Sequence, residues 1–249
     1  MRLKVVVCYD GTLFSGYQVQ PNARTVQGEI ERVLKKMHKG ESIRIHASGR
    51  TDQGVHAMGQ VFHFDSVLKI PPKNWERALN TMLPDDIQVQ SVQRVSDDFH
   101  ARFDVEEKEY RYMLYHQQTL NVFQRNYACF VLETLNIEEM RKACRYLIGT
   151  HDFSSFCAAN STVKGDKVRT IIEASIECEN NKIQFSIKGT GFLYNMVRII
   201  VGTLIEIGKG NRQPYDMQTI MQAKDRTYAD KTAPSQGLYL WEVIYEKNE

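Results

Sequence analysis

The pattern best suited to chemistry is the eleven-residue stretch from Ala47 to Ala57, Ala-Ser-Gly-Arg-Thr-Asp-Gln-Gly-Val-His-Ala. It places one carboxylate, Asp52, between Arg50 and His56, and it contains two glycines. An arginine within a few ångströms keeps a carboxylic acid ionised, because an opposite charge lowers its pKa. An ionised, oriented aspartate can act as a nucleophile or a base. The stretch therefore indicates a catalytic loop, with a turn closed by an Arg–Asp ion pair as the alternative.

The elements around this loop follow from the spacing of apolar residues. Strand-like residues at 42–47 and 59–65 flank it, and a loop between two strands holds its side chains on a rigid platform. A helix is expected from Val26, capped by Thr25, and another from Pro72. With further strands at 3–8 and 87–92, the order is β-α-β-β-α-β, the ferredoxin-like arrangement.

The second half of the chain partly repeats this order. Spacing predicts helices from Ile137 and over 192–207, and strands over the ranges 109–115, 168–178, 182–188 and 237–245. A charged segment near 98–108 has no apolar period and marks the boundary. We therefore predict an α+β fold of two ferredoxin-like or RRM-like halves with antiparallel sheets. Domain 1–104 would carry the Asp52 loop, and domain 105–249 would complete the site.

Composition limits the class of protein. Of 249 residues, 42% are hydrophobic, which is enough for a core, and no apolar run is long enough to span a bilayer. The five cysteines are widely spaced, which favours reduced thiols in a cytoplasmic protein and argues against a disulfide frame or a zinc site. The net charge of +2 leaves a nucleic-acid partner open, because the location of the charge matters more than its sum.

Two further segments carry polar groups on one side of an element. Lys108, Tyr110 and Tyr112 alternate along a strand and share a face, which is typical of a half-buried sheet surface or of a site. Asn195 and Arg198 share one side of the expected helix, where the alternative is a core helix with one snorkelling arginine.

The segment 49–57 resembles the catalytic loop of the tRNA pseudouridine synthase A family, with Asp52 at the position of the essential aspartate. Four other segments resemble the family's motifs in the same order: 9–18, 108–112, 191–198 and 233–238. In the first of these, tryptophan is common in the family where this chain has Tyr17. The resemblance covers nearly the whole chain.

This resemblance implies an isomerase that converts uridine to pseudouridine at positions 38, 39 and 40 of the tRNA anticodon stem-loop, without a metal or a cofactor. It also implies a homodimer and a central cleft between the two sheets. Asp52 would be the nucleophile and Arg198 would pair with it. Tyr110 and Leu238 would sandwich the uracil, and Arg50 would contact phosphate or fill the space left by the flipped base. Attack at C1′, attack at C6 and removal of the C2′ proton all stay open.

A non-catalytic RNA-binding protein with paired RRM-like sheets is the alternative class. Such sheets bind through exposed aromatic residues in a strand signature that this sequence lacks. A binding module would also have no need of the Asp52 loop. A purely structural role for Asp52 is a third hypothesis.

Overall fold

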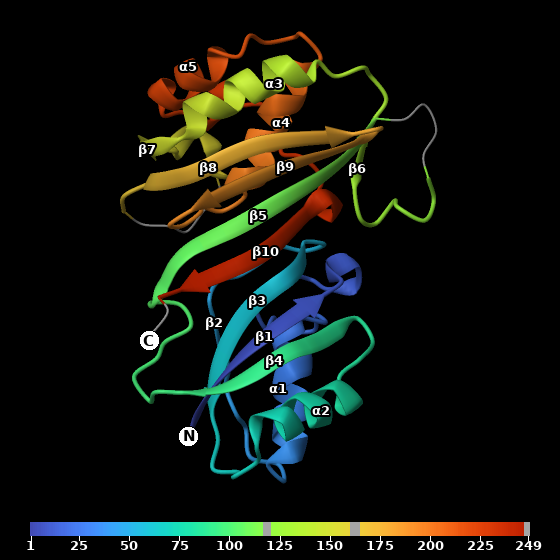
Figure 1. Cartoon of the computed structure of the whole chain (residues 1–249), viewed down its shortest axis with the longest axis vertical. Helices are drawn as coiled ribbons and strands as arrows, with labels where there is room; N and C mark the ends of the chain where they lie inside the picture. Colours follow the sequence, from blue (N-terminus) through green and yellow to red (C-terminus); the bar gives the residue numbers. More distant parts are fainter. Residues whose placement is uncertain (117–120, 160–164, 247–249) are drawn as a thin grey trace. The chain divides into compact units, whose positions relative to one another are not determined.

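The computed structural model describes residues 1–116, 121–159 and 165–246, which form two compact units (Figure 1). The first unit is Met1–Glu106 together with the described part of Tyr239–Glu249, and the second is Glu107–Leu238. Helices and mainly antiparallel strands build both units, so the predicted α+β class is confirmed. The domain boundaries predicted from the sequence stay a prediction.

The first unit is a sheet in the order β4–β1–β3–β10 with two helices. Its strands are β1 Arg2–Tyr9, β2 His46–Ala47, β3 His56–Asp65, β4 Ile87–Val95 and β10 Leu238–Tyr245. β1 is antiparallel to β3 and β4, β2 pairs antiparallel with β3, and β10 pairs parallel with the first residues of β3. The last strand of the chain therefore belongs to the first unit.

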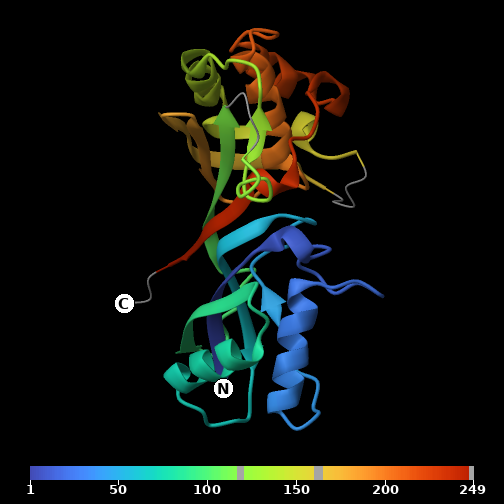
Figure 2. The same cartoon turned by 90° about the vertical axis from the view of Figure 1, so that its right-hand side faces the viewer.

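The helices α1 (Val26–Met37) and α2 (Pro72–Met82) lie next to each other on this sheet (Figure 2). Thr25 caps α1 as predicted, because its side chain accepts a hydrogen bond from the backbone N–H of Gly28. Trp75 of α2 packs edge-on against Phe64 of β3, and His38 at the end of α1 stacks on the same indole. One core thus joins both helices to one face of the sheet.

Two strands of the first unit differ from the sequence prediction. The strand expected over 42–47 is limited to β2, because the N–H of Ile45 donates to the carboxylate of Glu31 in α1 and not to a neighbouring strand. The strand expected over 59–65 already begins at His56, because β10 pairs there, with Tyr239 opposite His56. Both differences come from contacts with distant parts of the chain.

The second unit has an antiparallel sheet in the order β5–β9–β8–β7, with β6 parallel to β5. Its strands are β5 Val105–His116, which begins at the unit boundary, β6 Cys129–Val131, β7 Gly149–Asp152, β8 Val168–Glu179 and β9 Lys182–Gly189. Its helices are α3 Ile137–Cys144, α4 Met196–Gly208 and α5 Asp216–Ala223. Short 3-10 helices complete the chain: η1 Gly11–Leu13, η2 Arg145–Leu147, η3 Ser154–Phe156, η4 Arg226–Tyr228 and η5 Ser235–Gly237.

Helix α4 starts four residues later than predicted, at Met196 in place of residue 192. Asn195 precedes it with φ 59°, a left-handed conformation that cannot continue into the preceding residues as a helix. Most of α4 is buried, which fits a core helix that is apolar nearly all round. No helix among the described residues is long and apolar enough to cross a membrane.

Three histidines of the first unit form a cluster of rings, which we call the histidine cluster: His46, His63 and His100. The buried member is His63, whose Nδ1 accepts the backbone N–H of Ala101 at 3.1 Å. Burial, with Arg2 and the other two histidines close by, lowers the pKa of His63 from 6.5 to about 4. The folded unit therefore contains the neutral form of this ring.

The histidine cluster predicts a loss of stability in mild acid. Between pH 6.5 and about 4, the unfolded chain binds a proton at His63 that the folded chain does not bind. The free energy of unfolding should therefore fall as the pH is lowered through this window. In His63→Gln this contribution is absent, so the stability difference between wild type and variant should shrink from about pH 7 to about pH 5. Urea unfolding at several pH values measures it, and a constant difference would contradict the assignment.

Candidate active site

The Asp52 loop, residues 48–55, connects β2 to β3 and is hydrogen-bonded along β3. Gln60 of β3 is fully buried, and its side-chain amide bonds to the loop at two points. Its Oε1 accepts the hydroxyl of Ser48 at 2.7 Å, and its Nε2 donates to the carbonyl of Gly49 at 3.1 Å. One strand side chain therefore fixes the start of the loop.

The loop then closes in a turn around Asp52. The N–H of Val55 donates to the carbonyl of Asp52 at 3.1 Å, and Gly54 has φ +75°, a value that glycine adopts without strain. Asp52 is half-buried and Arg50 is exposed.

Two buried tyrosines from the start of the chain lie beneath the loop. Tyr9 and Thr51 share a hydrogen bond of 2.7 Å between their hydroxyl oxygens, and the N–H of Tyr17 donates to the Thr51 carbonyl at 3.0 Å. Burial raises the pKa of Tyr9 to about 12 and holds that of Tyr17 well above its usual value, so both phenols are neutral near pH 7. Thr51, the residue before Asp52, is therefore held by hydrogen bonds at both its side-chain hydroxyl and its backbone carbonyl.

His56, which ends the motif, is held inside the first unit. It is 2% exposed, and its ring stacks on Tyr239 of β10 with centroids 4.7 Å apart. Its Nδ1 accepts the N–H of Gly11 at 3.0 Å and lies 3.2 Å from a carboxylate oxygen of Asp10. A Cβ at Gly11 would lie 2.1 Å from the carbonyl oxygen of Val55, so only glycine permits this approach of η1. His56 therefore joins η1 to β3 and β10.

The two tyrosines allow a matched test of this packing. Tyr9→Phe should lower the free energy of unfolding by about 1–3 kcal/mol, because it leaves the buried Thr51 hydroxyl without that partner. Tyr17→Phe should be neutral or stabilising, because within the part of the chain that the structure describes the buried Tyr17 hydroxyl has no hydrogen-bond partner. Urea unfolding of both variants measures the difference. Equal losses would show that the Tyr9 contact contributes nothing specific.

In the second unit, α4 is bound to the segment that leads to η5. The Nε of Arg198 donates to the carbonyl of Ala233 at 2.8 Å, and the Ala233 N–H donates back to the Arg198 carbonyl at 3.0 Å. The Nη1 of Arg198 donates to Asn195 Oδ1 at 2.8 Å. One turn further on, a Cβ at Gly202 would lie 1.8 Å from the carbonyl oxygen of Lys231. The arginine side chain is therefore oriented by its own helix and by this segment.

The same segment also contacts β5. The hydroxyl of Tyr112 donates to the carbonyl of Pro234 at 2.7 Å, and a Cβ at Gly237 would lie 2.6 Å from the Tyr112 ring. Burial holds the pKa of Tyr112 well above its usual value, so it is a hydrogen-bond donor near neutral pH. Leu238 follows directly and is 6% exposed. Tyr112 thus positions the start of β10.

Tyr110 is two residues before Tyr112 on β5. It is half-buried, and its ring meets Phe192 edge-on with centroids 4.9 Å apart. Tyr110, Arg198 and Leu238 all belong to the second unit, where residues 233–238 contact both β5 and α4. Arg50 and Asp52 belong to the first unit. Among the described residues, no group of three His, Cys, Asp or Glu side chains is arranged to hold a metal ion.

The sequence analysis did not single out Gln60, and it did not foresee that His56 would be buried. The signal for Gln60 was available, because it is a polar residue inside an apolar strand run. A buried polar side chain needs partners, and in this case the partners are the loop itself. No signal in the sequence indicated that Tyr239 would stack on His56.

The close approach at Gly202 gives a further prediction. Glycine to alanine inside a helix usually stabilises by about 1 kcal/mol. At Gly202 the added methyl group meets a backbone oxygen, so Gly202→Ala should instead destabilise by about 1–3 kcal/mol. Gly208→Ala in the same helix is the control, because its new methyl group meets flexible side-chain atoms of Met140 and Leu135 and should cost less. Thermal or urea unfolding compares them, and the reverse order would contradict the packing.

Comparison with known proteins places this arrangement among its relatives. A family model described as "tRNA pseudouridine synthase" matches residues 5–104 and 143–246. A protein of Oceanobacillus iheyensis named tRNA pseudouridine synthase A is 54% identical over 247 residues, which covers 99% of this chain and 98% of that protein. Proteins of the same name from Geobacillus kaustophilus and Bacillus licheniformis are each 53% identical, covering 98% and 99% of this chain and 95% and 100% of their own lengths.

A solved Cbf5–Nop10–Gar1 complex is a distant structural match. It has 12% sequence identity and a TM-score of 0.35, and the match covers 81% of this chain and 54% of that one. At this similarity the match carries no argument.

Proposed function

This chain belongs to the tRNA pseudouridine synthase family and is an isomerase that forms pseudouridine in tRNA, and on this premise we propose that it modifies uridines 38, 39 and 40 of the anticodon stem-loop with Asp52 as the nucleophile. The non-catalytic alternative considered from the sequence is therefore wrong. The observation that carries the proposal is the Asp52 loop, whose start is bound to β3 and whose Thr51 is bound to two buried tyrosines.

The reaction moves one bond within the nucleotide. The N1–C1′ bond of uridine breaks, the uracil turns, and a C5–C1′ bond forms. C5 loses its proton and N1 gains one, so the product has the same atoms and the same oxidation state. A base in a stem or loop must leave the stack before such chemistry can begin. Asp52 would attack C1′ or C6, or remove the C2′ proton, and each route needs an ionised carboxylate in a fixed place.

The remaining side chains take supporting roles in this proposal. Arg198 would hold the Asp52 carboxylate, and its hydrogen bonds to Ala233 and Asn195 within the second unit already orient its guanidinium. Tyr110 and Leu238 would sandwich the uracil, with Phe192 against the edge of the tyrosine ring. Arg50 is exposed on the Asp52 loop and would contact a phosphate or occupy the space of the flipped base. A homodimer in the cytoplasm is part of the same proposal.

Asp52→Asn should abolish pseudouridine formation and leave tRNA binding largely intact. An amide of the same shape is not a nucleophile, whereas affinity for RNA depends mainly on phosphate contacts. Tritium release from tRNA labelled at C5 of uridine measures turnover, because that position loses its proton. Asp85→Asn makes the same chemical change at an exposed turn and should keep the wild-type rate. Substantial turnover by Asp52→Asn would disprove the nucleophile.

Tyr110→Phe and Tyr110→Ala separate stacking from proton transfer. Phenylalanine keeps the ring and removes only the hydroxyl, so a residue that only stacks would lose little. Tyr110→Ala removes the ring as well, and the lost stacking on the base should cost roughly 1–3 kcal/mol. We expect Tyr110→Phe to lose about 10²- to 10⁴-fold in single-turnover rate, the usual contribution of a positioned acid or base. A near-normal Tyr110→Phe together with a severely slowed His56→Ala would transfer that role to His56, although His56 is hydrogen-bonded and buried.

A further inference from the structure

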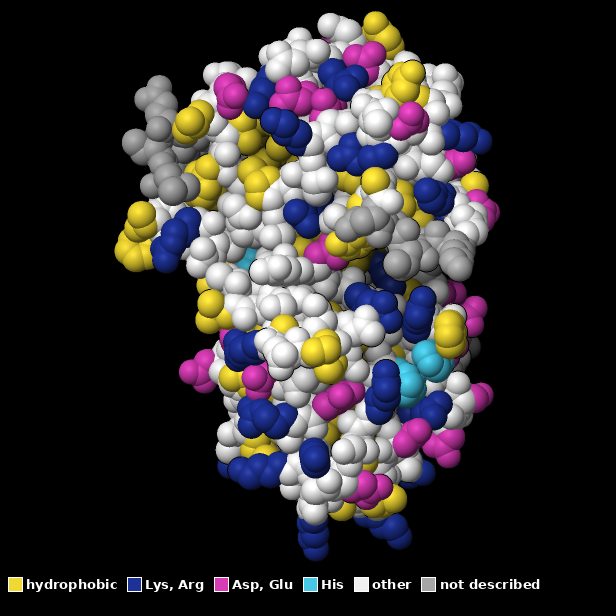
Figure 3. Space-filling model, turned by 180° about the vertical axis from the view of Figure 1, so that it is seen from behind, with side chains coloured by type: hydrophobic (Ala, Val, Ile, Leu, Met, Phe, Trp, Pro, Cys, Tyr) yellow, Lys and Arg dark blue, Asp and Glu magenta, His cyan; other side chains and the backbone are white. Residues whose placement is uncertain are grey.

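The first unit has an exposed patch of rings and cations that the proposed reaction does not use. We call it the ring patch: Arg44, His46, His100, Arg102 and Phe103. The ring of His100 stacks on Phe103 with centroids 4.2 Å apart, and His46 lies 5.7 Å from His100. On the face seen in Figure 3, Lys and Arg side chains gather around the histidines. The patch therefore combines flat rings with positive charge at the surface.

Phe103 is the apolar ring of the patch, and it is strongly exposed. It is 74% exposed although one side of its ring is stacked on His100. The Arg102 guanidinium carbon lies 5.8 Å from the ring centroid. An exposed aromatic ring beside an arginine is the arrangement on which an unpaired base stacks in single-stranded nucleic-acid sites.

The charge of the patch comes from its arginines. Arg44 and Arg102 are exposed, and among the described residues neither has an ion-pair partner. His100 contributes no charge near neutral pH, because burial lowers its pKa and its Nδ1 already accepts the N–H of Arg102. Asp104, which follows Phe103 in the chain, accepts the backbone N–H of His100 at 2.7 Å. Two unpaired guanidinium groups are therefore available to an anion.

We propose that the ring patch is a second RNA contact, in which Arg44 and Arg102 bind backbone phosphates and Phe103 stacks an unpaired base of the tRNA. This inference rests on the proposed function for its choice of RNA. His63, under the patch, is seven residues along β3 from His56, where the Asp52 loop ends. At about 3.3 Å per residue the separation is roughly 23 Å, a span of several stacked nucleotides. The patch would thus bind tRNA at nucleotides some distance from the target uridine.

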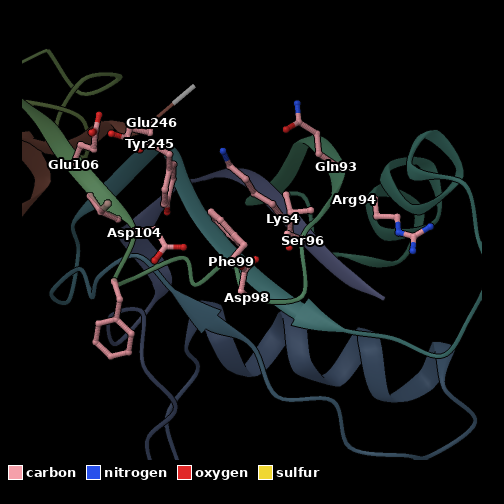
Figure 4. A pocket seen from close by; sticks show the side chains of 13 residues that line it. Lys4, Gln93, Arg94, Ser96, Asp98, Phe99, Asp104, Glu106, Tyr245 and Glu246 are labelled. Carbon is pink, nitrogen blue, oxygen red and sulfur yellow. The ribbon is translucent and has the colours of Figure 1, made fainter. Parts of the chain in front are cut away.

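A groove of about 1120 Å³ in the same unit adjoins the ring patch and has a more acidic lining (Figure 4). Lys4 extends between Phe99 and Tyr245, with its Nζ 4.3 Å from the Tyr245 centroid. Four carboxylates line this groove, from Asp98, Asp104, Glu106 and Glu246, together with two cations, Lys4 and Arg94. Phe103 of the ring patch lines it as well. Because the carboxylates outnumber the cations in the groove, we expect the RNA backbone to lie on the side of Phe103 that carries Arg44 and Arg102.

Charge variants test the phosphate contacts. The double variant Arg44→Gln/Arg102→Gln is compared with Lys35→Gln/Lys36→Gln, which removes the same charge from exposed positions of α1. Affinity for a fluorescent tRNA transcript is measured over a series of salt concentrations. The slope of log K against log salt should fall by about two for the patch variant, one per lost phosphate contact. The control should keep the wild-type slope, and equal slopes in both variants would overturn the proposal.

Ring variants test the base contact. Phe103→Ala should weaken tRNA binding roughly 5- to 150-fold, whereas Phe103→Tyr keeps the ring and should bind nearly as wild type. If Phe103→Ala instead shifts the oligomeric state in sedimentation and leaves tRNA affinity unchanged, the patch is a protein contact and the proposal fails. Wild-type protein that forms no pseudouridine in tRNA would contradict the proposed function, and the binding measurements would distinguish that failure from a failure of the patch.

Discussion

The geometry of the Asp52 loop depends on one buried amide. Gln60 is fully enclosed, so its donor and acceptor must find partners inside the protein, and an unmet group would cost about 1–3 kcal/mol. Ser48 and Gly49 supply those partners from the loop. The amide and the loop therefore hold each other in place, and neither can move without exposing or orphaning a polar group.

The second unit orients its proposed site residues through backbone carbonyls. Arg198 and Tyr112 each donate to a carbonyl in the segment before β10, so one stretch of chain fixes a guanidinium and a phenol together. Glycines permit these approaches, because any side chain at Gly202 or Gly237 would overlap a neighbouring group. Each unit thus arranges its own residues before substrate arrives, which is how an enzyme lowers the cost of reaching its reactive geometry.

Local signals predicted more of this protein than long-range contacts did. Helix α1 has its predicted start and its Thr25 cap, because capping depends on residues three apart. The short β2 could not be predicted, because the N–H of Ile45 bonds to Glu31 of α1. The resemblance of separated motifs indicated the family, which the comparisons show. The role of Gln60 depends on a strand meeting a loop, and that of His56 on a ring 183 positions later in the chain, at Tyr239.

The pairing of β10 with β3 has a consequence for how the protein is made. The strand that completes the first unit beside His56 follows the whole of the second unit in the chain. A ribosome therefore finishes the second unit while the first still lacks this strand, and Tyr239, the stacking partner of His56, is added only after the second unit. Such pairing across a long separation is intrinsically slow to form. The sheet beside the Asp52 loop is thus completed only after the second unit has been synthesised, and a chain that stops before β10 would lack that strand.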